Sequence, residues 1–160
     1  MRLLHIYLSP EHNFFGHHGQ PAGRAPTVEV PEATAVAGQG LVGDRFFGHK
    51  DDYKGQVTLF SIETYRDLCS RFGLAEDAAD VSLFRRNLVV EGADLPALIG
   101  TEFELCGVRF LGTEEAAPCY WMNQAFADGA EEAMRGRGGL RAKVLTGGIL
   151  RSERNANALA

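Results

Sequence analysis

The sequence has few cysteines, no long hydrophobic run and only a modest excess of charge, and each of these features excludes a class of protein. Three cysteines with no C-x-x-C spacing argue against a disulfide framework and against a zinc knuckle. No apolar run approaches the roughly 18 residues that a membrane span needs. The first residues also lack the apolar stretch of a signal peptide. We therefore expect a soluble, cytoplasmic protein with no membrane association.

The charge balance is acidic, with 16 Lys and Arg against 21 Asp and Glu and a formal net charge of −5 over 160 residues. Nucleic-acid-binding domains normally carry a basic excess, so no nucleic-acid partner is expected. A hydrophobic fraction of 45% is enough for a core, and this length suits a single domain. The 19 glycines are about 12% of the 160 residues, above the usual share of roughly 7%, and they indicate many turns and short strands.

The apolar pattern predicts a strand-rich domain with one clear helix. Strands are expected at residues 3–8, 27–30, 33–37, 56–60, 87–90, 101–105, 108–111, 140–145 and 149–150. The last four of these are expected to form two β-hairpins. A helix is predicted over 61–71 with Ser61 as its N-cap, and shorter helices or turns at 118–126 and 130–135. Short strands with frequent glycine turns favour a closed or partly closed barrel, because closure removes exposed edges.

The sharpest local feature is Ala117-Pro118-Cys119-Tyr120-Trp121. Because proline is tolerated at the start of a helix, Cys119 is expected in a first helical turn, where free N–H groups and the helix dipole favour a thiolate. A thiolate is both a nucleophile and a soft metal ligand. The alternative is an ordinary half-buried cysteine beside two aromatic residues. A cysteine protease is disfavoured, since every histidine lies upstream of Cys119.

Basic residues gather near the C-terminus, six of them between residues 134 and 154 against one acidic residue. The run Arg137-Gly138-Gly139-Leu140-Arg141 places guanidinium groups beside flexible backbone, which suits a phosphate or another compact anion. Arg85-Arg86-Asn87, just before a predicted strand, offers a second group of this kind. The alternative is a solvated surface.

A third group of side chains could hold zinc. Four histidines and three carboxylates supply plausible ligands, although without the helical spacing of a metalloprotease site. They are His12, His17, His18 and His49 with Glu11, Asp51 and Asp52. Histidines in a loop are also often merely solvated.

Several segments occur in an order that resembles a stand-alone MOSC domain, named for the molybdenum cofactor sulfurase C-terminal domain. They are Gly40-Leu41-Val42-Gly43-Asp44-Arg45, Gly55-Gln56-Val57-Thr58-Leu59-Phe60, Arg86-Asn87-Leu88-Val89-Val90-Glu91-Gly92, the predicted hairpin at 100–110 and Pro118-Cys119. The resemblance covers roughly residues 28–150 of a domain expected at 1–150, with a polar tail at 151–160. It implies a mainly β fold, a MOSC-type β-barrel with a few peripheral α-helices in a single domain.

The resemblance also implies site residues. Cys119 matches the family's key cysteine, which ligates molybdenum or carries sulfur, and the family's pocket holds a phosphate-bearing pterin. The implied cofactor-binding residues are Asp44, Arg45, Arg86, Asn87, Arg137 and Arg141, the last two by chemical type alone. Larger relatives add an N-terminal β-barrel or an aminotransferase-like domain. Both are missing here, so pyridoxal phosphate binding is not expected.

The leading hypothesis is a molybdenum-cofactor-associated protein in which Cys119 ligates molybdenum or carries a persulfide. If the protein is catalytic, it is expected to be an oxidoreductase that removes oxygen from N-hydroxylated substrates. It would need an electron-donor protein, since no flavin or nicotinamide fingerprint is present. One rival is a non-catalytic sulfur or cofactor carrier that receives sulfur from a donor through Cys119. The other is a zinc-binding interaction domain built on the histidine-rich loop. The sequence specifies neither the substrate nor the oligomeric state.

Overall fold

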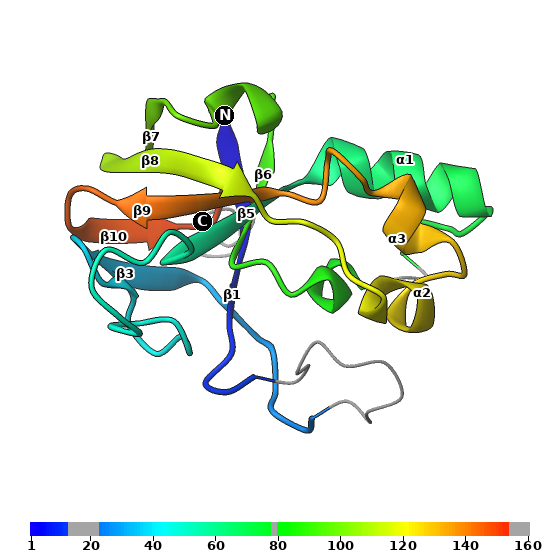
Figure 1. Cartoon of the computed structure of the whole chain (residues 1–160), viewed down its shortest axis with the longest axis horizontal. Helices are drawn as coiled ribbons and strands as arrows, with labels where there is room; N and C mark the ends of the chain where they lie inside the picture. Colours follow the sequence, from blue (N-terminus) through cyan, green and yellow to red (C-terminus); the bar gives the residue numbers. More distant parts are fainter. Residues whose placement is uncertain (13–22, 78–79, 154–160) are drawn as a thin grey trace.

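The computed structural model describes residues 1–12, 23–77 and 80–153, whose strands form two sheets (Figure 1). The larger sheet has the order β2-β1-β6-β5-β9-β8-β7 and the smaller one β10-β3-β4. The strands are β1 (Arg2–Leu8), β2 (Val28–Val30), β3 (Glu32–Val36), β4 (Gly40–Leu41), β5 (Val57–Ser61), β6 (Leu88–Glu91), β7 (Glu102–Leu105), β8 (Val108–Glu115), β9 (Leu140–Val144) and β10 (Gly148–Arg151). The larger sheet curls into a half-barrel, which confirms the prediction of a mainly β single domain.

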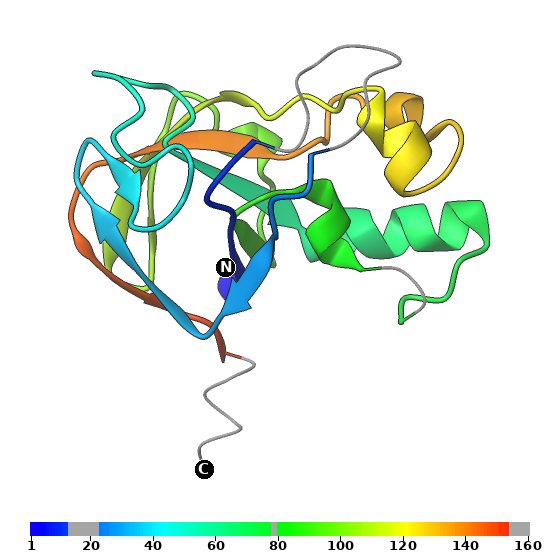
Figure 2. The same cartoon turned by 90° about the horizontal axis from the view of Figure 1, so that it is seen from below.

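The helices gather at one end of the molecule, beside the larger sheet (Figures 1 and 2). They are α1 (Ile62–Phe72), α2 (Trp121–Ala125), α3 (Ala130–Ala133) and the 3₁₀ turn η1 (Val81–Phe84), whereas the 3₁₀ turn η2 (Pro96–Leu98) lies beside β8. The main helix lies where the sequence predicts it. The Ser61 hydroxyl accepts a hydrogen bond from Thr64 N–H at 3.1 Å, and Gly73 ends the helix in the left-handed conformation.

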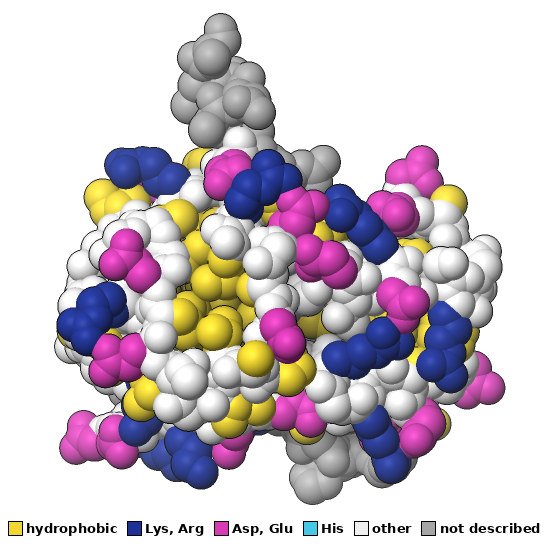
Figure 3. All heavy atoms as spheres, turned by 90° about the horizontal axis from the view of Figure 1, so that it is seen from above, with side chains coloured by type: hydrophobic (Ala, Val, Ile, Leu, Met, Phe, Trp, Pro, Cys, Tyr) yellow, Lys and Arg dark blue, Asp and Glu magenta, His cyan; other side chains and the backbone are white. Residues whose placement is uncertain are grey.

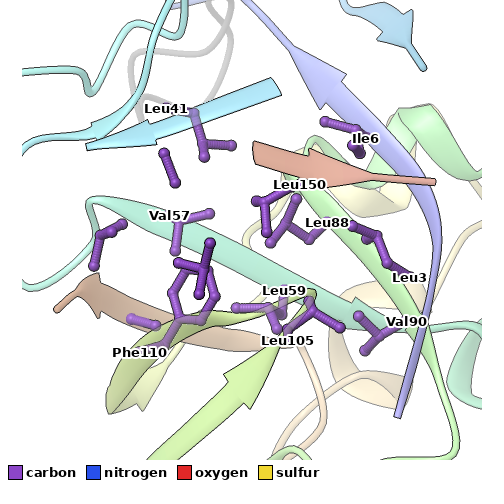
Figure 4. Close-up of a cluster of buried hydrophobic side chains, with 14 of the residues drawn as sticks. Leu3, Ile6, Leu41, Val57, Leu59, Leu88, Val90, Leu105, Phe110 and Leu150 are labelled. Atoms are coloured by element: carbon purple, nitrogen blue, oxygen red, sulfur yellow. The ribbon is translucent and has the colours of Figure 1, made fainter. Parts of the chain in front are cut away.

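Two hydrophobic cores lie on opposite faces of the central strands. The first core fills the space between the two sheets, where side chains such as Leu59, Phe110 and Leu150 point toward one another (Figure 4). The second packs the helices against the outer face through residues such as Phe60. Because both of its faces are covered, every residue of β5 is buried, including the polar Thr58 and Ser61.

One of the two predicted hairpins forms and the other does not. β7 and β8 pair with Leu105 opposite Val108, and the intervening Cys106 and Gly107 both have positive φ, as a two-residue hairpin turn requires. The expected hairpin between 140–145 and 149–150 is wrong, because β9 pairs with β5 and β8 whereas β10 pairs with β3. The chain between them passes from one sheet to the other.

The surface mixes charges of both signs. On the face shown in Figure 3, acidic and basic side chains surround a hydrophobic area, and neither sign dominates. Within the described part of the chain, no helix is long and apolar enough to cross a membrane. The expected polar tail begins later than predicted, since Arg151 ends β10 and Ser152 is buried with its N–H bonded to Pro31 O. Its remainder, 154–160, lies outside the described residues.

Candidate functional site: an arginine-lined pocket beside Cys119

A pocket of about 240 Å³ opens between the ends of the central strands and the segment that leads into α2. Its polar side chains are basic or nucleophilic, and no carboxylate is found among the described residues that line it. They include His12, Arg45, Arg85, Arg86, Cys119 and Arg141. Aromatic and apolar side chains complete the wall, among them Phe46, Tyr53 and Trp121. Such a pocket is suited to an anionic ligand with a flat apolar part.

A larger groove of about 680 Å³ beside α1 has the opposite character. Carboxylates dominate its polar lining, from Glu29, Glu76, Asp77, Asp80 and Glu91, beside Arg2 and Arg66. Several of these are already bonded: Glu91 pairs with both arginines and Glu29 with the His5 ring at 2.7 Å. The arginine-lined pocket is therefore the better candidate for the predicted anion site.

The Gly43-Asp44-Arg45 motif forms a turn that follows β4. The buried Asp44 carboxylate accepts hydrogen bonds from Ser9 N–H at 3.2 Å and Phe46 N–H at 3.1 Å, which closes this turn. The Arg45 N–H donates to Ser9 O at 2.9 Å. These bonds aim the Arg45 side chain into the pocket, where its guanidinium lies 4.7 Å from the centre of the Phe46 ring. Burial lowers the pKa of Arg45, and Asp44 nearby partly opposes that shift.

Two consecutive arginines reach the same pocket because Arg85 adopts a left-handed conformation, with φ of 54°. With the described residues its guanidinium makes long contacts, 3.3 Å to the Ser9 hydroxyl, 3.4 Å to the Thr27 hydroxyl and 3.5 Å to Glu11 O. Among the described residues, no carboxylate forms an ion pair with it. Burial, followed by the charge of Arg45, lowers the pKa of Arg85 to about 10. A nearby anion would relieve both effects.

Arg86 lies deeper and is bonded differently. Its guanidinium donates to backbone carbonyls, the shortest contact being 2.7 Å to Ala116 O. Burial lowers the pKa of Arg86 to about 10, and the neighbouring Cys119 acts in the opposite direction. Arg86 therefore combines a buried charge with direct contact to the segment that precedes the cysteine.

Cys119 is exposed at the pocket, but the prediction that it lies in a first helical turn is wrong. α2 begins two residues later, at Trp121, and the Cys119 carbonyl accepts a hydrogen bond from Met122 N–H at 2.9 Å. Pro118 is therefore not a helix-initiating residue. It belongs to an extended segment that leaves β8, and the thiol is presented from a loop.

The remaining predicted site residues divide between the pocket and other places. Arg141 lines the pocket, with one nitrogen 3.1 Å from Glu114 Oε1. Arg137 does not; it pairs with Asp67 at 2.6 Å beside the start of α1. Asn87 lies behind the pocket, where its side chain donates to Asp44 Oδ2 at 2.9 Å.

Sequence reasoning identified the Arg85-Arg86-Asn87 run but chose only Arg86 and Asn87 as cofactor contacts. Two neighbours in an extended strand would point to opposite faces, whereas the left-handed turn at Arg85 directs both arginines into the pocket. Trp121 and Tyr53 were not predicted as pocket residues either. Cys69 is buried on α1, and Cys106 is in the β7–β8 turn.

The zinc alternative finds no support in the described residues. Within 1–12, 23–77 and 80–153, no three His, Cys, Asp or Glu side chains are placed to hold a metal ion. His12 and His49 instead pack against the Phe46 ring, with centroid distances of 5.0 and 5.8 Å. His17 and His18 lie outside the described residues.

Comparison with known families decides the class. The family model of the MOSC domain matches residues 17–157, a longer stretch than the sequence motifs indicated. The chain belongs to the MOSC domain family. Membership associates it with molybdenum-cofactor-related functions in general. Comparison with curated proteins gave no significant match.

Solved structures share the MOSC fold. The YuaD protein from Bacillus subtilis superposes with a TM-score of 0.73 at 17% identity, over 94% of this chain and 91% of that one. YiiM from Escherichia coli gives 0.64 at 18%, over 96% and 67%, and YiiM from Geobacillus stearothermophilus gives 0.64 at 14%, over 94% and 70%. At such identities the similarity establishes the fold alone.

Proposed function

We propose that the arginine-lined pocket of this MOSC domain binds molybdenum cofactor, with Cys119 as the ligand to the metal. The observation that carries the proposal is one exposed thiol on a pocket whose lining holds four arginines. A thiolate is a soft ligand suited to a heavy transition metal. Guanidinium groups suit the cofactor's phosphate.

The residues present fit the donor set that the cofactor requires. Arg45 and Arg85 would hold the phosphate, because both guanidinium groups line the pocket with partly buried charges; Arg45 is 3.6 Å from one oxygen of Asp44, and Arg85 has no ion pair among the described residues. The rings of Phe46, Tyr53 and Trp121 would contact a flat ring system and exclude water from it. Arg141 would add a weaker attraction, since Glu114 already neutralises part of its charge.

The bound cofactor would supply two-electron redox chemistry, and the chain itself would supply binding and orientation. We propose reduction of an N-hydroxylated substrate, in which two electrons and two protons convert the N–OH group to N–H and release water. The electrons must come from a separate donor protein, because no flavin or nicotinamide motif is present in the sequence. The pocket's open side, where Cys119 is exposed, is where substrate would enter.

Metal and pterin content tests the proposal. The protein would be purified from a host that makes molybdenum cofactor, beside Cys119→Ser and the matched control Cys106→Ser, whose thiol is exposed on a distant hairpin turn. We expect nearly one molybdenum and one pterin per chain in the wild type and in Cys106→Ser, and a loss of molybdenum in Cys119→Ser. Equal molybdenum in all three proteins would contradict the assignment of Cys119.

The same experiment distinguishes the carrier alternative. A sulfur carrier would lack molybdenum in the wild type and would show the mass of one additional sulfur atom on the peptide that contains Cys119. Protein of that kind would bind its sulfur donor and would not reduce N-hydroxylated compounds on its own.

A further inference from the structure

The guanidinium of Arg86 is already occupied by the backbone of its own chain. Four of its five N–H groups are directed at carbonyl oxygens, so little capacity remains for an anion. The acceptors are Phe84 at 3.0 Å, Ala116 at 2.7 Å, Ala117 at 3.4 Å and Gly138 at 3.1 Å. Two of these residues belong to the Cys119 loop, which we define as residues 116–120.

The Cys119 loop also packs closely against two glycines that themselves contact Arg86. A Cβ atom added at Gly138 would lie 2.6 Å from Ala116 O and 2.7 Å from Pro118 Cδ, closer than side-chain carbons approach such atoms. The Ala116 N–H donates to Gly139 O at 2.9 Å. The loop therefore contacts both the Arg86 guanidinium and a strip of bare backbone that Arg86 also bonds. The glycines of this run serve close packing, which differs from the flexible anion cradle expected from the sequence.

We propose that Arg86 is a positioning residue that holds the Cys119 loop in place, whereas Arg45 and Arg85 bind the anion. The proposal rests on the proposed function for the use that it gives to Cys119. A lysine cannot replace Arg86 in this role, because an ammonium group lacks the planar fork that reaches carbonyls from three chain segments. Among the described residues, Arg45 and Arg85 have no comparable set of carbonyl contacts, and Arg85 reaches one backbone oxygen, Glu11 O at 3.5 Å.

Two measurements on the full chain without cofactor test this division of roles. The first is amide hydrogen exchange in the Cys119 loop, followed by mass spectrometry of its peptide. The second is binding of pyrophosphate, used as the probe for the anion site. The variants are Arg86→Lys, which keeps the charge but loses the fork, and Gly138→Ala, which pushes the loop away while leaving every arginine intact. Gly147→Ala is the matched control, since its Cβ would meet only Ala35 O at an ordinary 3.4 Å.

We expect exchange in the Cys119 loop to accelerate about tenfold or more in Arg86→Lys and Gly138→Ala, with pyrophosphate affinity within about twofold of the wild type. Gly147→Ala should change neither. Guanidinium ion at low millimolar concentration should restore slow exchange in Arg86→Ala by filling the vacated space. Arg45→Gln and Arg85→Gln should show the reverse pattern, a loss of pyrophosphate binding with unchanged exchange.

The proposal is overturned if Arg86→Lys loses pyrophosphate affinity as far as Arg45→Gln does while its loop exchanges at the wild-type rate. If Arg86→Lys does not fold, Gly138→Ala decides, and a wild-type exchange rate in that variant overturns the proposal. Failure of the wild type to bind pyrophosphate would overturn the role given to Arg45 and Arg85. Because none of these measurements needs molybdenum, their outcome is separate from that of the metal analysis.

Discussion

At the scale of single residues, Arg85 in the pocket differs from the exposed arginines in how its charge is paired. Exposed arginines such as Arg109 and Arg151 form ion pairs with Glu102 and Glu32. Exposed pairs of this kind contribute little to stability. Arg85, in contrast, is half-buried, and its polar contacts with described residues are to hydroxyl and carbonyl oxygens at long distances. A buried positive charge of this kind is stabilised when an anion binds, which is why we assign it to binding.

Replacing either anion-binding arginine should weaken phosphate binding specifically. We expect Arg45→Gln and Arg85→Gln each to lose about 1.5–3 kcal/mol of pyrophosphate affinity, the range for a hydrogen bond to a charged group. Isothermal titration calorimetry would measure the loss, with Arg109→Gln as the control for a change in overall charge. An equal loss in Arg109→Gln would show that only net charge matters.

Asn87 is expected to stabilise the fold behind the pocket through its buried hydrogen bonds. Its Oδ1 accepts from both the N–H and the hydroxyl of Thr58 at 3.0 Å, and its Nδ2 donates to Tyr7 O at 3.2 Å and Asp44 Oδ2 at 2.9 Å. Asn87→Ala would strand these buried groups, and each group left unpaired costs about 1–3 kcal/mol. Urea denaturation should therefore show a large loss. A loss below about 1 kcal/mol would contradict this account of the network.

The sequence identified Asp44 and Asn87 as special residues but not the bond that joins them. Motif order can indicate which residues matter, whereas a contact between residues 43 positions apart depends on how β1, β4 and β6 are brought together. The structure places this pair behind the pocket, where it ties the turn that carries Arg45 to the strand that follows Arg86.

At the scale of elements, α1 is fixed at its start by a small polar arrangement. The Ser61 hydroxyl caps Thr64 N–H and donates to Glu63 Oε2 at 2.7 Å, while Glu63 Oε1 accepts from Gly92 N–H at 2.6 Å. Partial burial acts to raise the pKa of Glu63, but these hydrogen bonds outweigh it and the pKa is lowered. The stability that Glu63 contributes is therefore present above its ordinary pKa of 4.5 and is lost as the pH falls through the lowered value.

Removal of the Ser61 cap should lower the free energy of unfolding and should also weaken the dependence of that free energy on pH. We expect Ser61→Ala to lower the free energy of unfolding by about 1 kcal/mol at neutral pH. The difference in unfolding free energy between wild type and variant should narrow as the pH falls below 4.5. Glu63 then becomes protonated, and the hydrogen bond from Ser61 to its carboxylate no longer stabilises the wild type. Denaturation curves over this pH range would measure both effects. A difference that widens toward acid would contradict the assigned sign.

Elements with a strong local signal were predictable and those decided by long-range pairing were not. α1 has apolar residues at helical spacing and a serine cap. The β7–β8 hairpin has two short strands joined by Cys106-Gly107, a pair that adopts the two positive φ angles of a tight turn. Along the chain, β9 and β10 show the same strand–turn–strand pattern as the β7–β8 hairpin, yet they do not pair with each other. The pairing partners of β9 and β10 depend on how the two sheets pack around one core, and a local sequence pattern does not contain this information. The predicted start of α2 at residue 118 was likewise too early, because Pro118 can occupy extended backbone as readily as a first helical turn.

At the scale of the whole molecule, the two cores share the central strands β1, β5 and β6, each of which contributes buried residues to both. Leu59 faces the core between the sheets, and the adjacent Phe60 faces the helices, as alternation along a strand requires. The two cores are therefore mechanically linked through β5. The pocket lies where strands, turns and α2 meet, so its geometry depends on both.

This linkage predicts a single unfolding transition. Trp121 is the only tryptophan and lies by the pocket beside α2, so its fluorescence reports on the helical end, whereas far-UV circular dichroism averages over the molecule. We expect the two signals to change together in urea. Leu59→Ala and Phe60→Ala should each lower stability by about 2–5 kcal/mol without separating the signals. Two transitions at different urea concentrations would show that the cores unfold independently.

The central claim is that the arginine-lined pocket holds a phosphate-bearing molybdenum cofactor at Cys119. The most direct test is an anomalous difference map, recorded across the molybdenum absorption edge on crystals of protein from a cofactor-producing host. The account predicts a peak at bonding distance from Cys119 Sγ and phosphate density between Arg45 and Arg85. A molybdenum peak at any other place, with this pocket filled only by solvent, would contradict it.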